Sequence, residues 1–477
     1  MIHAYTAESI RSIEQVSLDR DGQATLMRRA AAAVAEQVLV ALPGPLPGRR
    51  VVVLVGPGNN GGDALLAGAL LRRRGLAVTA VLTAPDRTHA VALAEFRRRA
   101  GRVLAADSRG VAGLISGADA IVDGLVGLSA RPPLRSPMDA LVTAANESAA
   151  VRVAVDLPSG VDPATGTVDG PVFAADVTVT FGAVKTGLLV TDAAGQLICD
   201  PIGMDPADAP GVGVDAVALT EGDLDRWLPG PGTTDDKYSG GLVGIVAGSP
   251  GYPGAAVLCT GGAVRTRPGM VRYAGAQGGA VLARWPEVVA SETPDGAGRV
   301  QAWVVGPGLG TDDRAMELLR FVLGEDVPVL VDADALTLLA QHPDLLAGRA
   351  GRPTVLTPHE REFARIFPEI DLADRLRAAR SAAATSGATV LLKGHRTVVA
   401  APDGTTAVNR SGSSWLASAG SGDVLSGVIG SLLATGLEPW QAAAAGAFLH
   451  GRAGERAQAA GLAGASALWD FLGRPAA

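Results

Sequence analysis

The sequence holds little cysteine, few aromatic residues and no long apolar run. Two cysteines occur in 477 residues, Cys199 and Cys259, and their wide separation indicates neither a disulfide framework nor a zinc site. Aromatic residues make up 4% of the chain. No apolar stretch approaches the roughly 18 residues that a membrane helix needs, and the N-terminus lacks a charged-then-apolar signal pattern. We therefore expect a soluble cytoplasmic protein of a reducing compartment, without a membrane partner.

An excess of positive charge is also missing. The chain carries 41 basic and 48 acidic residues, for a formal net charge of −7, and no basic stripe stands out. A nucleic-acid partner is therefore not expected. Small apolar residues are abundant instead, because 48% of the chain is hydrophobic and 62 residues are glycine. This composition suits close-packed α/β layers better than a β-sandwich.

The most informative stretch is S-A-G-S-G-D-V-L-S-G at 418–427, which opens an apolar helix. Gly420 and Gly422 allow a tight turn with exposed N–H groups, and the positive end of the helix points to the same place, so we expect an anion site. Asp423 would repel a phosphate there unless it handles a proton or a bridging cation. The pattern therefore indicates phosphoryl transfer, with Asp423 as the base toward a substrate hydroxyl. The alternative is an ordinary helix cap.

The first half of the chain alternates between predicted helices and strands. We expect a helix over residues 5–40. The predicted strands that follow are Val51–Val55, Val78–Leu82, Ala120–Val122, Val151–Val155 and Val177–Phe181. The first of them ends in a glycine loop, G-P-G-N-N-G-G-D at 56–63, that enters a helix. Strand, glycine loop and helix form the first unit of a doubly wound sheet, and ligands bind near such a loop.

Three of these strand ends carry polar residues. The polar residues at these three strand ends are Asn59, Asn60, Asp63, Asp123, Asp156 and Ser159. Because the carboxyl ends of parallel strands meet at one edge of a sheet, we expect a site there. The set suits an oxygen cage for a hard cation, with one carboxylate left for proton transfer. The alternative, that such residues only shape turns, would explain one loop more easily than three.

The composition of the sequence changes after Pro201, where Pro, Gly and Asp become frequent. We expect a domain boundary near 210–225 and divide the chain into domains 1–215 and 216–477. Strand and helix alternate again in the second domain, which predicts a second α/β sandwich. Its predicted strands are Leu242–Ala247, Trp303–Val305, Val329–Val331, Val355–Leu356 and Val390–Leu392, with a hairpin of Val398–Ala401 and Thr405–Val408.

Loops of the second domain hold further candidate residues. Lys393 ends a strand expected beside the glycine loop, and it would either neutralise a phosphate or stay solvated. His359 stands at a helix start, where it would either donate to an acidic group of the substrate or cap the helix. The glycine-rich segment Gly306–Gly310 permits the close approach of a flat or phosphorylated ligand.

Together these motifs resemble a known pair of enzyme domains. G-P-G-N-N-G-G-D, V-D-G-L-V-G and D-L-P-S-G resemble the NAD(P)H-hydrate epimerase domain. G-S-P-G-Y-P-G-A-A, G-P-G-L-G, D-A-D-A-L, L-T-P-H-E, L-L-K-G and A-G-S-G-D-V-L-S-G resemble the NAD(P)H-hydrate dehydratase, which has a ribokinase-like fold. The chain, from about residue 5 to 470, is similar to bacterial fusions of the two.

The resemblance implies a fold and a function. It implies a Rossmann-like three-layer sandwich followed by a ribokinase-like α/β sandwich. The first domain would interconvert the R and S epimers of NADHX and NADPHX, the nicotinamide cofactors hydrated at C6, and would bind K⁺. The second would dehydrate the S epimer with ADP and Mg²⁺, by phosphorylating the C6 hydroxyl and eliminating phosphate. A homo-oligomer is left open.

The resemblance also implies roles for particular residues. Potassium ligands would be Asn60, Asp123 and Ser159, and Asp156 would be the acid/base of the epimerase. The hydrate would bind the first domain at Asn59, Asn60, Gly61, Gly62, Asp63, Gly127, Leu128, Ser129, Ala130, Arg131, Pro132, Pro133 and Asp156. In the second domain the hydrate contacts would be Ala255, Gly308, His359 and Asp423. The nucleotide would bind at Lys393, Gly394, His395, Arg396, Thr397 and Gly422.

Two alternatives remain on the residues alone. The chain would be a ribokinase-like kinase of another small alcohol, with the first domain as a passenger. Or the first domain would be a binding module without catalysis, since a pocket for a cation and a dinucleotide can bind without turnover.

Overall fold

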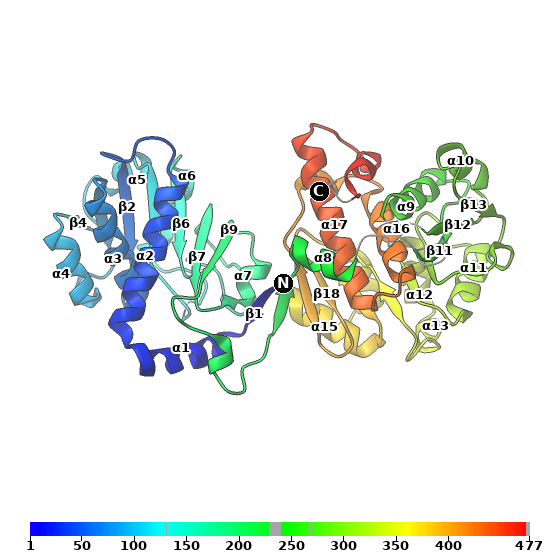
Figure 1. Ribbon diagram of the computed structural model, residues 1–477, viewed down its shortest axis with the longest axis horizontal. Helices are drawn as coiled ribbons and strands as arrows, with labels where there is room; N and C mark the ends of the chain where they lie inside the picture. Colours follow the sequence, from blue (N-terminus) through cyan, green and yellow to red (C-terminus); the bar gives the residue numbers. More distant parts are fainter. Residues whose placement is uncertain (130, 229–239, 267–268, 474–477) are drawn as a thin grey trace. The chain divides into compact units, whose positions relative to one another are not determined.

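A computed structural model of the chain describes residues 1–129, 131–228, 240–266 and 269–473. The chain divides into two compact units, His3–Asp215 and Ala216–Ala477, and the second unit also includes Met1 and Ile2 (Figure 1). We call these units the N-terminal and the C-terminal domain. No helix in the described ranges is long and apolar enough to cross a membrane.

The N-terminal domain is built on a seven-stranded parallel sheet, in the order β4-β3-β2-β5-β6-β7-β9. Its strands are β2 (Arg50–Val55), β3 (Ala77–Leu82), β4 (Arg102–Ala105), β5 (Ala120–Gly124), β6 (Val151–Val155), β7 (Val177–Phe181) and β9 (Gln196–Asp200). The strand order changes direction between β2 and β5. In a doubly wound sheet this switch point opens a crevice at the carboxyl ends of the strands.

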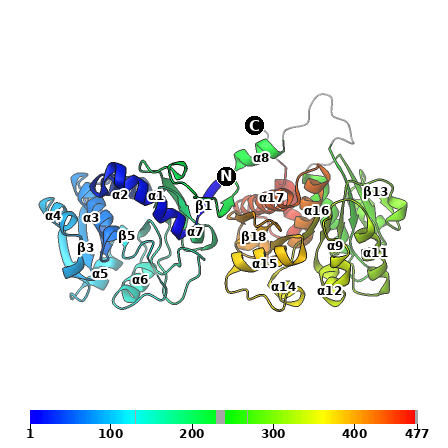
Figure 2. The same cartoon turned by 90° about the horizontal axis from the view of Figure 1, so that it is seen from below.

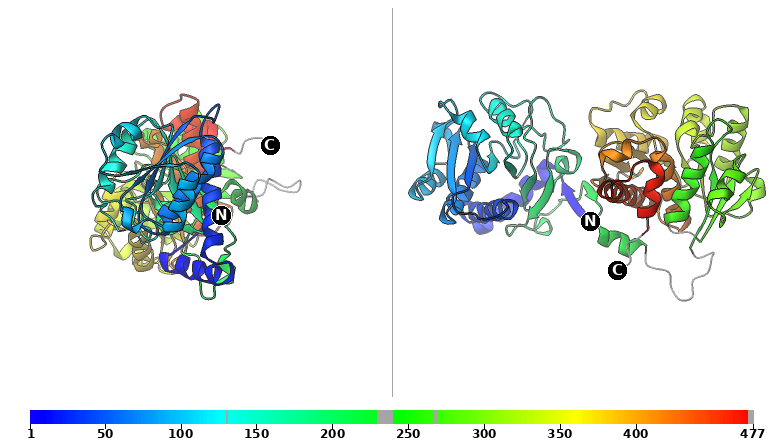
Figure 3. Two further views of the ribbon diagram at one scale, coloured as in Figure 1. Left: turned by 90° about the vertical axis from the view of Figure 1, so that its left-hand side faces the viewer. Right: turned by 90° about the horizontal axis from the view of Figure 1, so that it is seen from above.

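Helices cover both faces of this sheet, so the domain has the three layers that the sequence predicts. Alternate residues of β2 point to opposite faces. Val51, Val53 and Val55 belong to one apolar core, while Val52 and Leu54 belong to the other. The first core contains residues of α1 (Ala7–Asp21), α2 (Gln23–Ala41), α3 (Asn59–Arg73) and α4 (Ala90–Arg98), and the second contains residues of α5 (Val111–Ser116) and α6 (Met138–Glu147). Figure 3 (right) shows the sheet between blue helices and cyan helices.

The single helix predicted over residues 5–40 is wrong, because α1 and α2 are separate helices. Gly22 joins them with φ 75°, a left-handed conformation that glycine adopts without a steric penalty. Thr6 caps α1, since its side chain accepts a hydrogen bond from the Ser9 backbone N–H at 3.1 Å. The two helices run in different directions (Figure 1). The spacing of apolar residues continues across Gly22 and therefore did not indicate the break.

The C-terminal domain contains a larger mixed sheet, in which strands follow the order β13-β12-β11-β14-β15-β16-β17-β18-β19-β10. They are β10 (Ala216–Ala218), β11 (Leu242–Val246), β12 (Met270–Ala274), β13 (Val289–Ser291), β14 (Ala302–Val305), β15 (Val329–Val331), β16 (Thr354–Leu356), β17 (Thr389–Leu392), β18 (Thr397–Ala400) and β19 (Thr406–Asn409). The strands from β13 to β17 pair in parallel. β18 and β19 form the predicted antiparallel hairpin.

Helices again cover both faces of the C-terminal sheet. One apolar core joins the sheet to α9 (Pro253–Thr266), α16 (Ser421–Ala434) and α17 (Pro439–Ala459). α14 (Glu360–Ile366) and α15 (Arg375–Ser386) lie on the other face (Figure 2). The prediction of a second α/β sandwich is therefore confirmed.

Candidate active sites

The first candidate site is a pocket of about 360 Å³ at the switch point of the N-terminal sheet. Its walls come from α1, α2, the start of α3, the end of β7 and the loops that follow β2, β5, β6 and β9. The predicted hydrate-binding residues that line it are Asn59, Asn60, Asp63, Gly127, Leu128, Ser129 and Asp156. Three separate strand ends therefore meet at one site, as their sequence positions predict.

Other predicted positions surround the pocket without lining it. A Cβ atom on Gly61 would lie 2.2 Å from the Gly56 carbonyl oxygen, and one on Gly62 would lie 2.5 Å from Met27 Cε. These two glycines therefore serve the close packing of the loop. Arg131, Pro132 and Pro133 follow on the same segment as Ser129 but do not line the pocket. Ala130 lies outside the described residues.

The three predicted potassium ligands lie in one hydrogen-bond network. Asp123 is fully buried, its Oδ1 accepts from Ser159 Oγ at 2.7 Å, and its Oδ2 accepts from the Ser159 N–H at 2.8 Å. Asn60 Nδ2 donates to the Val126 carbonyl at 2.7 Å, and the Val126 N–H donates to Ser159 Oγ at 3.3 Å. Burial raises the pKa of Asp123 to about 6, although the hydrogen bonds from Ser159 oppose this shift.

This network fits a hard cation. The carboxylate, hydroxyl and amide groups all offer oxygen atoms, which hard cations prefer. Asp123 makes no ion pair with a basic side chain in the described part of the chain, so a bound cation would offset its buried charge. Among the described residues, no group of three His, Cys, Asp or Glu side chains is placed to hold a metal ion.

Asp156 lines the pocket and has an unusual backbone conformation. It follows β6 with φ 67°, a left-handed conformation that is uncommon outside glycine and that gathers at functional sites. Its Oδ1 accepts a hydrogen bond from Lys185 Nζ, which is fully buried, and another from Thr180 Oγ1 at 3.2 Å. Lys185, at the end of β8 (Val184–Lys185), was not predicted as a site residue. Its signal in the sequence is a lysine inside an apolar segment.

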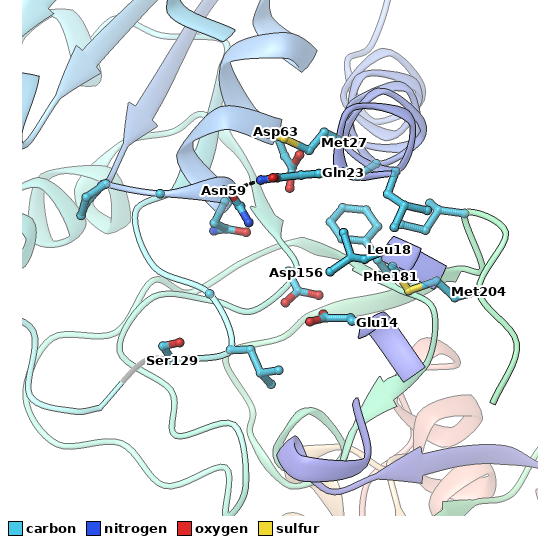
Figure 4. A pocket seen from close by; sticks show the side chains of 18 residues that line it. Glu14, Leu18, Gln23, Met27, Asn59, Asp63, Ser129, Asp156, Phe181 and Met204 are labelled. Carbon is cyan, nitrogen blue, oxygen red and sulfur yellow. Dashed lines mark hydrogen bonds between the residues drawn. The ribbon is translucent and has the colours of Figure 1, made fainter. Parts of the chain in front are cut away.

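Two further carboxyl groups line the same pocket. Asp63, in the first turn of α3, was predicted to bind the hydrate, whereas Glu14, on α1, was not predicted. Burial raises the pKa of both, and the negative charge of Asp156 adds to the shift. Figure 4 shows Glu14 beside Asp156, with Asp63 higher in the pocket near Met27. No local sequence motif marks Glu14 as a site residue. Glu14 reaches the pocket because the chain turns at Gly22, between α1 and α2.

The second candidate site surrounds the glycine loop of the C-terminal domain. Gly420, with φ 85°, precedes α16, and Asp423 lies in the first turn of that helix. A Cβ atom on Gly422 would lie 3.7 Å from Lys393 Nζ, so the lysine adjoins the loop as predicted. Lys393 Nζ donates to Asp332 Oδ1 at 2.7 Å and lies 3.8 Å from Glu362 Oε2. Lys393 is therefore held in an ion pair with its side chain 20% exposed, and its contact with a phosphate stays a prediction.

Asp332 links Lys393 to α16, the helix that carries Asp423. It follows β15, is 1% exposed, and its Oδ2 accepts from Ser426 Oγ on α16 at 2.6 Å. Burial, and then the charge of Asp332, raises the pKa of Asp423 to about 7, while Lys393 opposes the shift. A carboxyl group with this pKa suits a general base at neutral pH. Asp332 lies in a motif of the sequence but was given no role there, and Ser426 was likewise not singled out.

Comparisons with known proteins found matches to both domains. The family described as NAD(P)H-hydrate dehydratase matches residues 243–468, and the family described as YjeF-related protein N-terminus matches residues 23–187. A bifunctional NAD(P)H-hydrate repair enzyme from Mycobacterium tuberculosis (strain ATCC 25618 / H37Rv) is 52% identical, over 93% of this chain and 92% of its own length. The chain belongs to the bifunctional NAD(P)H-hydrate repair enzymes.

Two more similarities complete the comparison. A bifunctional NAD(P)H-hydrate repair enzyme from Mycobacterium leprae is 49% identical, over 95% of this chain and 93% of its own length. Among solved structures, an ADP/ATP-dependent NAD(P)H-hydrate dehydratase from Bacillus subtilis, co-crystallised with ATP and Mg²⁺, is 28% identical. That match has a TM-score of 0.47 and covers 55% of this chain and 97% of the other.

In this member of the NAD(P)H-hydrate repair family, His359 caps α14. Its Nδ1 accepts from the N–H groups of Arg361 at 3.1 Å and Glu362 at 3.2 Å. The structure therefore shows the capping alternative. Because Nδ1 is an acceptor, the neutral ring carries its proton on Nε2, which lies 3.4 Å from Glu362 Oε1. A contact from Nε2 to the hydrate stays a prediction.

The remaining predicted positions of the repair enzyme fall into two groups. Ala255 and Gly308 adjoin, because a Cβ atom on Gly308 would lie 2.6 Å from Ala255 Cβ. The predicted nucleotide positions Gly394, His395, Arg396 and Thr397 connect β17 to β18. Within this turn, Thr397 Oγ1 donates to the Gly394 carbonyl at 3.2 Å. Gly308 lies on the loop after β14 and Ala255 in the first turn of α9, while Gly394, His395 and Arg396 form the turn that leads to Thr397, the first residue of β18.

Proposed function

We propose that this chain repairs hydrated nicotinamide cofactors. Its N-terminal domain interconverts the R and S epimers of NADHX and NADPHX, and its C-terminal domain dehydrates the S epimer to NADH or NADPH with ADP. The observation that carries this proposal is the placement of Asp423, with a pKa raised to about 7, at a glycine loop beside Lys393. The 52% identity with a bifunctional repair enzyme supports the combination of both activities.

The chemistry of dehydration explains why a kinase-like site is needed. Hydroxide is a poor leaving group from C6 of the hydrated ring. The C6 hydroxyl oxygen attacks the terminal phosphorus of ADP while Asp423 takes the hydroxyl proton, and AMP leaves. The C6–O bond then breaks with its electrons going to phosphate, and loss of a ring proton restores the double bond. The N–H groups at the start of α16 hold the transferring phosphoryl group.

Particular residues of the C-terminal domain hold the charges in this reaction. Lys393, which keeps its positive charge because Asp332 and Glu362 outweigh the cost of burial, lies where it neutralises phosphate oxygens. Mg²⁺ bound with the nucleotide supplies further neutralisation of the phosphates. The predicted nucleotide residues Gly394, His395, Arg396 and Thr397, which follow Lys393, bind the same ADP.

In the N-terminal domain the hydrate occupies the pocket at the switch point. Asp156 is its acid/base residue, and Asn60, Asp123 and Ser159 hold K⁺, which offsets the buried charge of Asp123. We expect KCl to raise the melting temperature of the N-terminal domain more than choline chloride of equal ionic strength does. Asp123→Asn should remove this difference. An equal response to both salts would argue against a potassium site.

The experiment that tests the proposal follows the near-ultraviolet absorbance of NADH. The wild-type chain is added to a mixture of both NADHX epimers with Mg²⁺ and K⁺, with either ADP or ATP, beside an Asp423→Ala variant. Recovery of NADH from both epimers, abolished in the variant, supports both activities. Recovery limited to the share of one epimer leaves the N-terminal domain a binding module. No recovery, with nucleotide consumed only when another alcohol is offered, indicates a small-molecule kinase.

The two nucleotide arms decide between ADP and ATP, for which the sequence resemblance favours ADP. The assignment of the activities to residues 1–215 and 216–477, a cytoplasmic location and a homo-oligomer stay predictions of the same proposal.

A further inference from the structure

We propose that Asp63 and Asp156 form a two-residue acid–base pair in the N-terminal pocket. Asp63 holds a proton in the resting enzyme, Asp156 is a carboxylate, and the hydrated ring binds between them. This inference rests on the proposed epimerase function, and it assigns to Asp63 a chemical role beyond the binding of substrate.

Inversion at C6 needs one acid and one base on different sides of the ring. The lone pair of the ring nitrogen forms a double bond to C6 while the C6–O bond breaks, and the departing oxygen takes the proton of Asp63 and leaves as water. A water molecule on the other side then forms a new C6–O bond, the double-bond electrons return to nitrogen, and Asp156 takes the proton. No electrons are gained or lost, and one water replaces another.

The pair can catalyse epimerisation in both directions, because each turnover exchanges the protonation states of Asp63 and Asp156. After one turnover Asp156 carries the proton and Asp63 is ionised, which is the state that the reverse epimerisation needs. A transfer of one proton between the two carboxyl groups, through pocket water, restores the starting state. Groups that act as acid in one direction act as base in the other.

Lys185 holds the Asp156 side chain in place through an ion pair. It is fully buried, and its Nζ donates to Asp156 Oδ1, to Thr180 Oγ1 at 2.9 Å and to the Phe181 carbonyl at 3.2 Å. These bonds use the three donors of the ammonium group, so Lys185 is a positioning residue with no donor left for substrate. Both hydrogen bonds to Asp156 from the described residues reach Oδ1, which leaves Oδ2 for the pocket.

Asp63 has the opposite surroundings. Its side chain is 9% exposed, it lines the pocket, and its Oδ1 has no hydrogen-bond partner among the described residues. Leaving a charged oxygen buried without a partner is costly, whereas a protonated carboxyl group is tolerated there and offers a donor to a ligand. Burial, and then the charges of Asp156 and Glu14, raises the pKa of Asp63 well above its usual range.

The neighbours of Asp63 come from several elements. Glu14 on α1 and Asp156 after β6 add negative charge, Lys185 on β8 adds positive charge beyond Asp156, and His89 packs against the adjacent Gly62. Figure 4 shows Asp63 and Asp156 entering the pocket from different walls, while Glu14 lies beside Asp156. Asp63 is therefore the carboxyl group placed to face the other side of the ring. When the surroundings of two titratable groups favour different protonation states, one group can act as the acid and the other as the base.

The test uses the full-length chain and the separate R and S epimers of NADHX. The variants are Asp63→Asn, Asp63→Glu, Asp156→Asn and Glu14→Gln, and Asp169→Asn on the exposed surface of the same domain is the matched control. NADH formation from the S epimer reports an intact C-terminal domain. NADH formation from the R epimer, corrected for spontaneous exchange, reports epimerisation, and melting curves report folding.

We expect Asp63→Asn and Asp156→Asn each to slow turnover of the R epimer at least about a hundredfold, with KM little changed and dehydration of the S epimer unaffected. In the wild type, epimerase activity should fall as rising pH removes the proton of Asp63. Asp63→Glu should keep reduced activity with that alkaline limb, whereas the residual activity of Asp63→Asn should lack it. Glu14→Gln should move the limb to lower pH, because it removes a negative charge that raises the pKa of Asp63, and Asp169→Asn should match the wild type.

Different results separate this inference from the proposed function. If the wild-type chain does not accelerate epimer exchange, the epimerase function fails, and the acid–base pair fails with it. If the wild type is active and folded Asp63→Asn keeps its turnover, the pair alone is overturned. Loss of turnover in Glu14→Gln with retention in Asp63→Asn also overturns it, since the second acid would then be Glu14.

Discussion

Both sites place a carboxyl group against a buried or partly buried lysine and leave a second carboxyl group with a raised pKa nearby. In the N-terminal domain the ion pair is Asp156 with Lys185, and in the C-terminal domain it is Asp332 with Lys393. Both sites also contain a residue other than glycine at positive φ, Asp156 at 67° and Ala333 at 50°. Such strained positions persist where the surroundings hold them, which is typical of reacting centres.

The Asp332→Asn substitution should lower the pKa of Asp423. It removes a negative charge that raises this pKa, and it frees Lys393, whose positive charge lowers it. Because the base must be ionised, dehydration of the S epimer should rise with pH through about 7 in the wild type. In the variant this rise should lie about one pH unit lower, at saturating ADP. Asp344→Asn, an exposed position, is the control, and an unmoved midpoint in Asp332→Asn would contradict the argument.

His450 should make the C-terminal domain sensitive to acid. It is buried on α17, its Nε2 lies 2.9 Å from the Ser421 carbonyl oxygen, and burial lowers its pKa to about 4 from the usual 6.5. Its contribution to stability is therefore present above about pH 6.5 and lost as pH falls toward 4. The loss should reach about 3 kcal/mol.

Urea unfolding at about pH 7.5 and about pH 5 measures this contribution. His450→Gln keeps a donor for the Ser421 carbonyl but does not titrate, so the difference between the two pH values should shrink in the variant. Equal acid sensitivity in both proteins would show that another group is responsible.

At the scale of elements, α16 owes its position to close contact with α9. A Cβ atom on Gly427 would lie 1.9 Å from the Cys259 carbonyl oxygen, and one on Gly262 would lie 2.2 Å from the Val424 carbonyl oxygen. Glycine at both points lets the two helix backbones approach. This contact begins at Val424, the residue after Asp423, so it also fixes the position of Asp423.

Gly427→Ala should therefore harm both stability and catalysis. Overpacking of a close-packed core costs typically about 1–3 kcal/mol, and the clash with backbone atoms places this site at the upper end. Dehydration should fall as Asp423 is displaced, while epimerisation should stay unchanged. The control is Gly324→Ala at the end of α11 (Asp313–Gly324), where an added Cβ meets nothing within 4 Å. Denaturant unfolding and NADH formation from the S epimer provide the two readouts.

The predictability of an element depended on its place in the sheet. Interior strands such as β2 and β15 carry continuous apolar runs, because both faces of a parallel strand are buried, and their positions were predicted to within a residue. The edge strands β4, β9 and β13 were not predicted, because exposed and polar residues replace the apolar run there. The interior strand β12 was also not predicted, since Arg272 interrupts its apolar residues.

At the scale of the whole molecule, the chain forms two compact units. We expect one activity in each unit, so each activity should survive the loss of the other. Asp156→Asn should still dehydrate the S epimer, and Asp423→Ala should still exchange the epimers. An equimolar mixture of the two variants should recover NADH from both epimers, because the S epimer diffuses from one chain to the other. A mixture that recovers only the share of the S epimer, at concentrations where the wild type consumes both, would point to transfer within one chain.

The sequence by itself determined the two α/β domains, the glycine loops, the strand-end residues Asp63, Asp123 and Asp156, and Asp423 at a helix start. These features follow from local patterns: apolar runs, glycine spacing and the rule that parallel strands end at one edge. Only the tertiary structure decided how these residues are charged. Asp156 meets a lysine 29 positions away, and Asp332 meets a serine 94 positions away. Such pairs depend on strand order and helix packing, which bring distant segments together, and no local pattern in the chain encodes them.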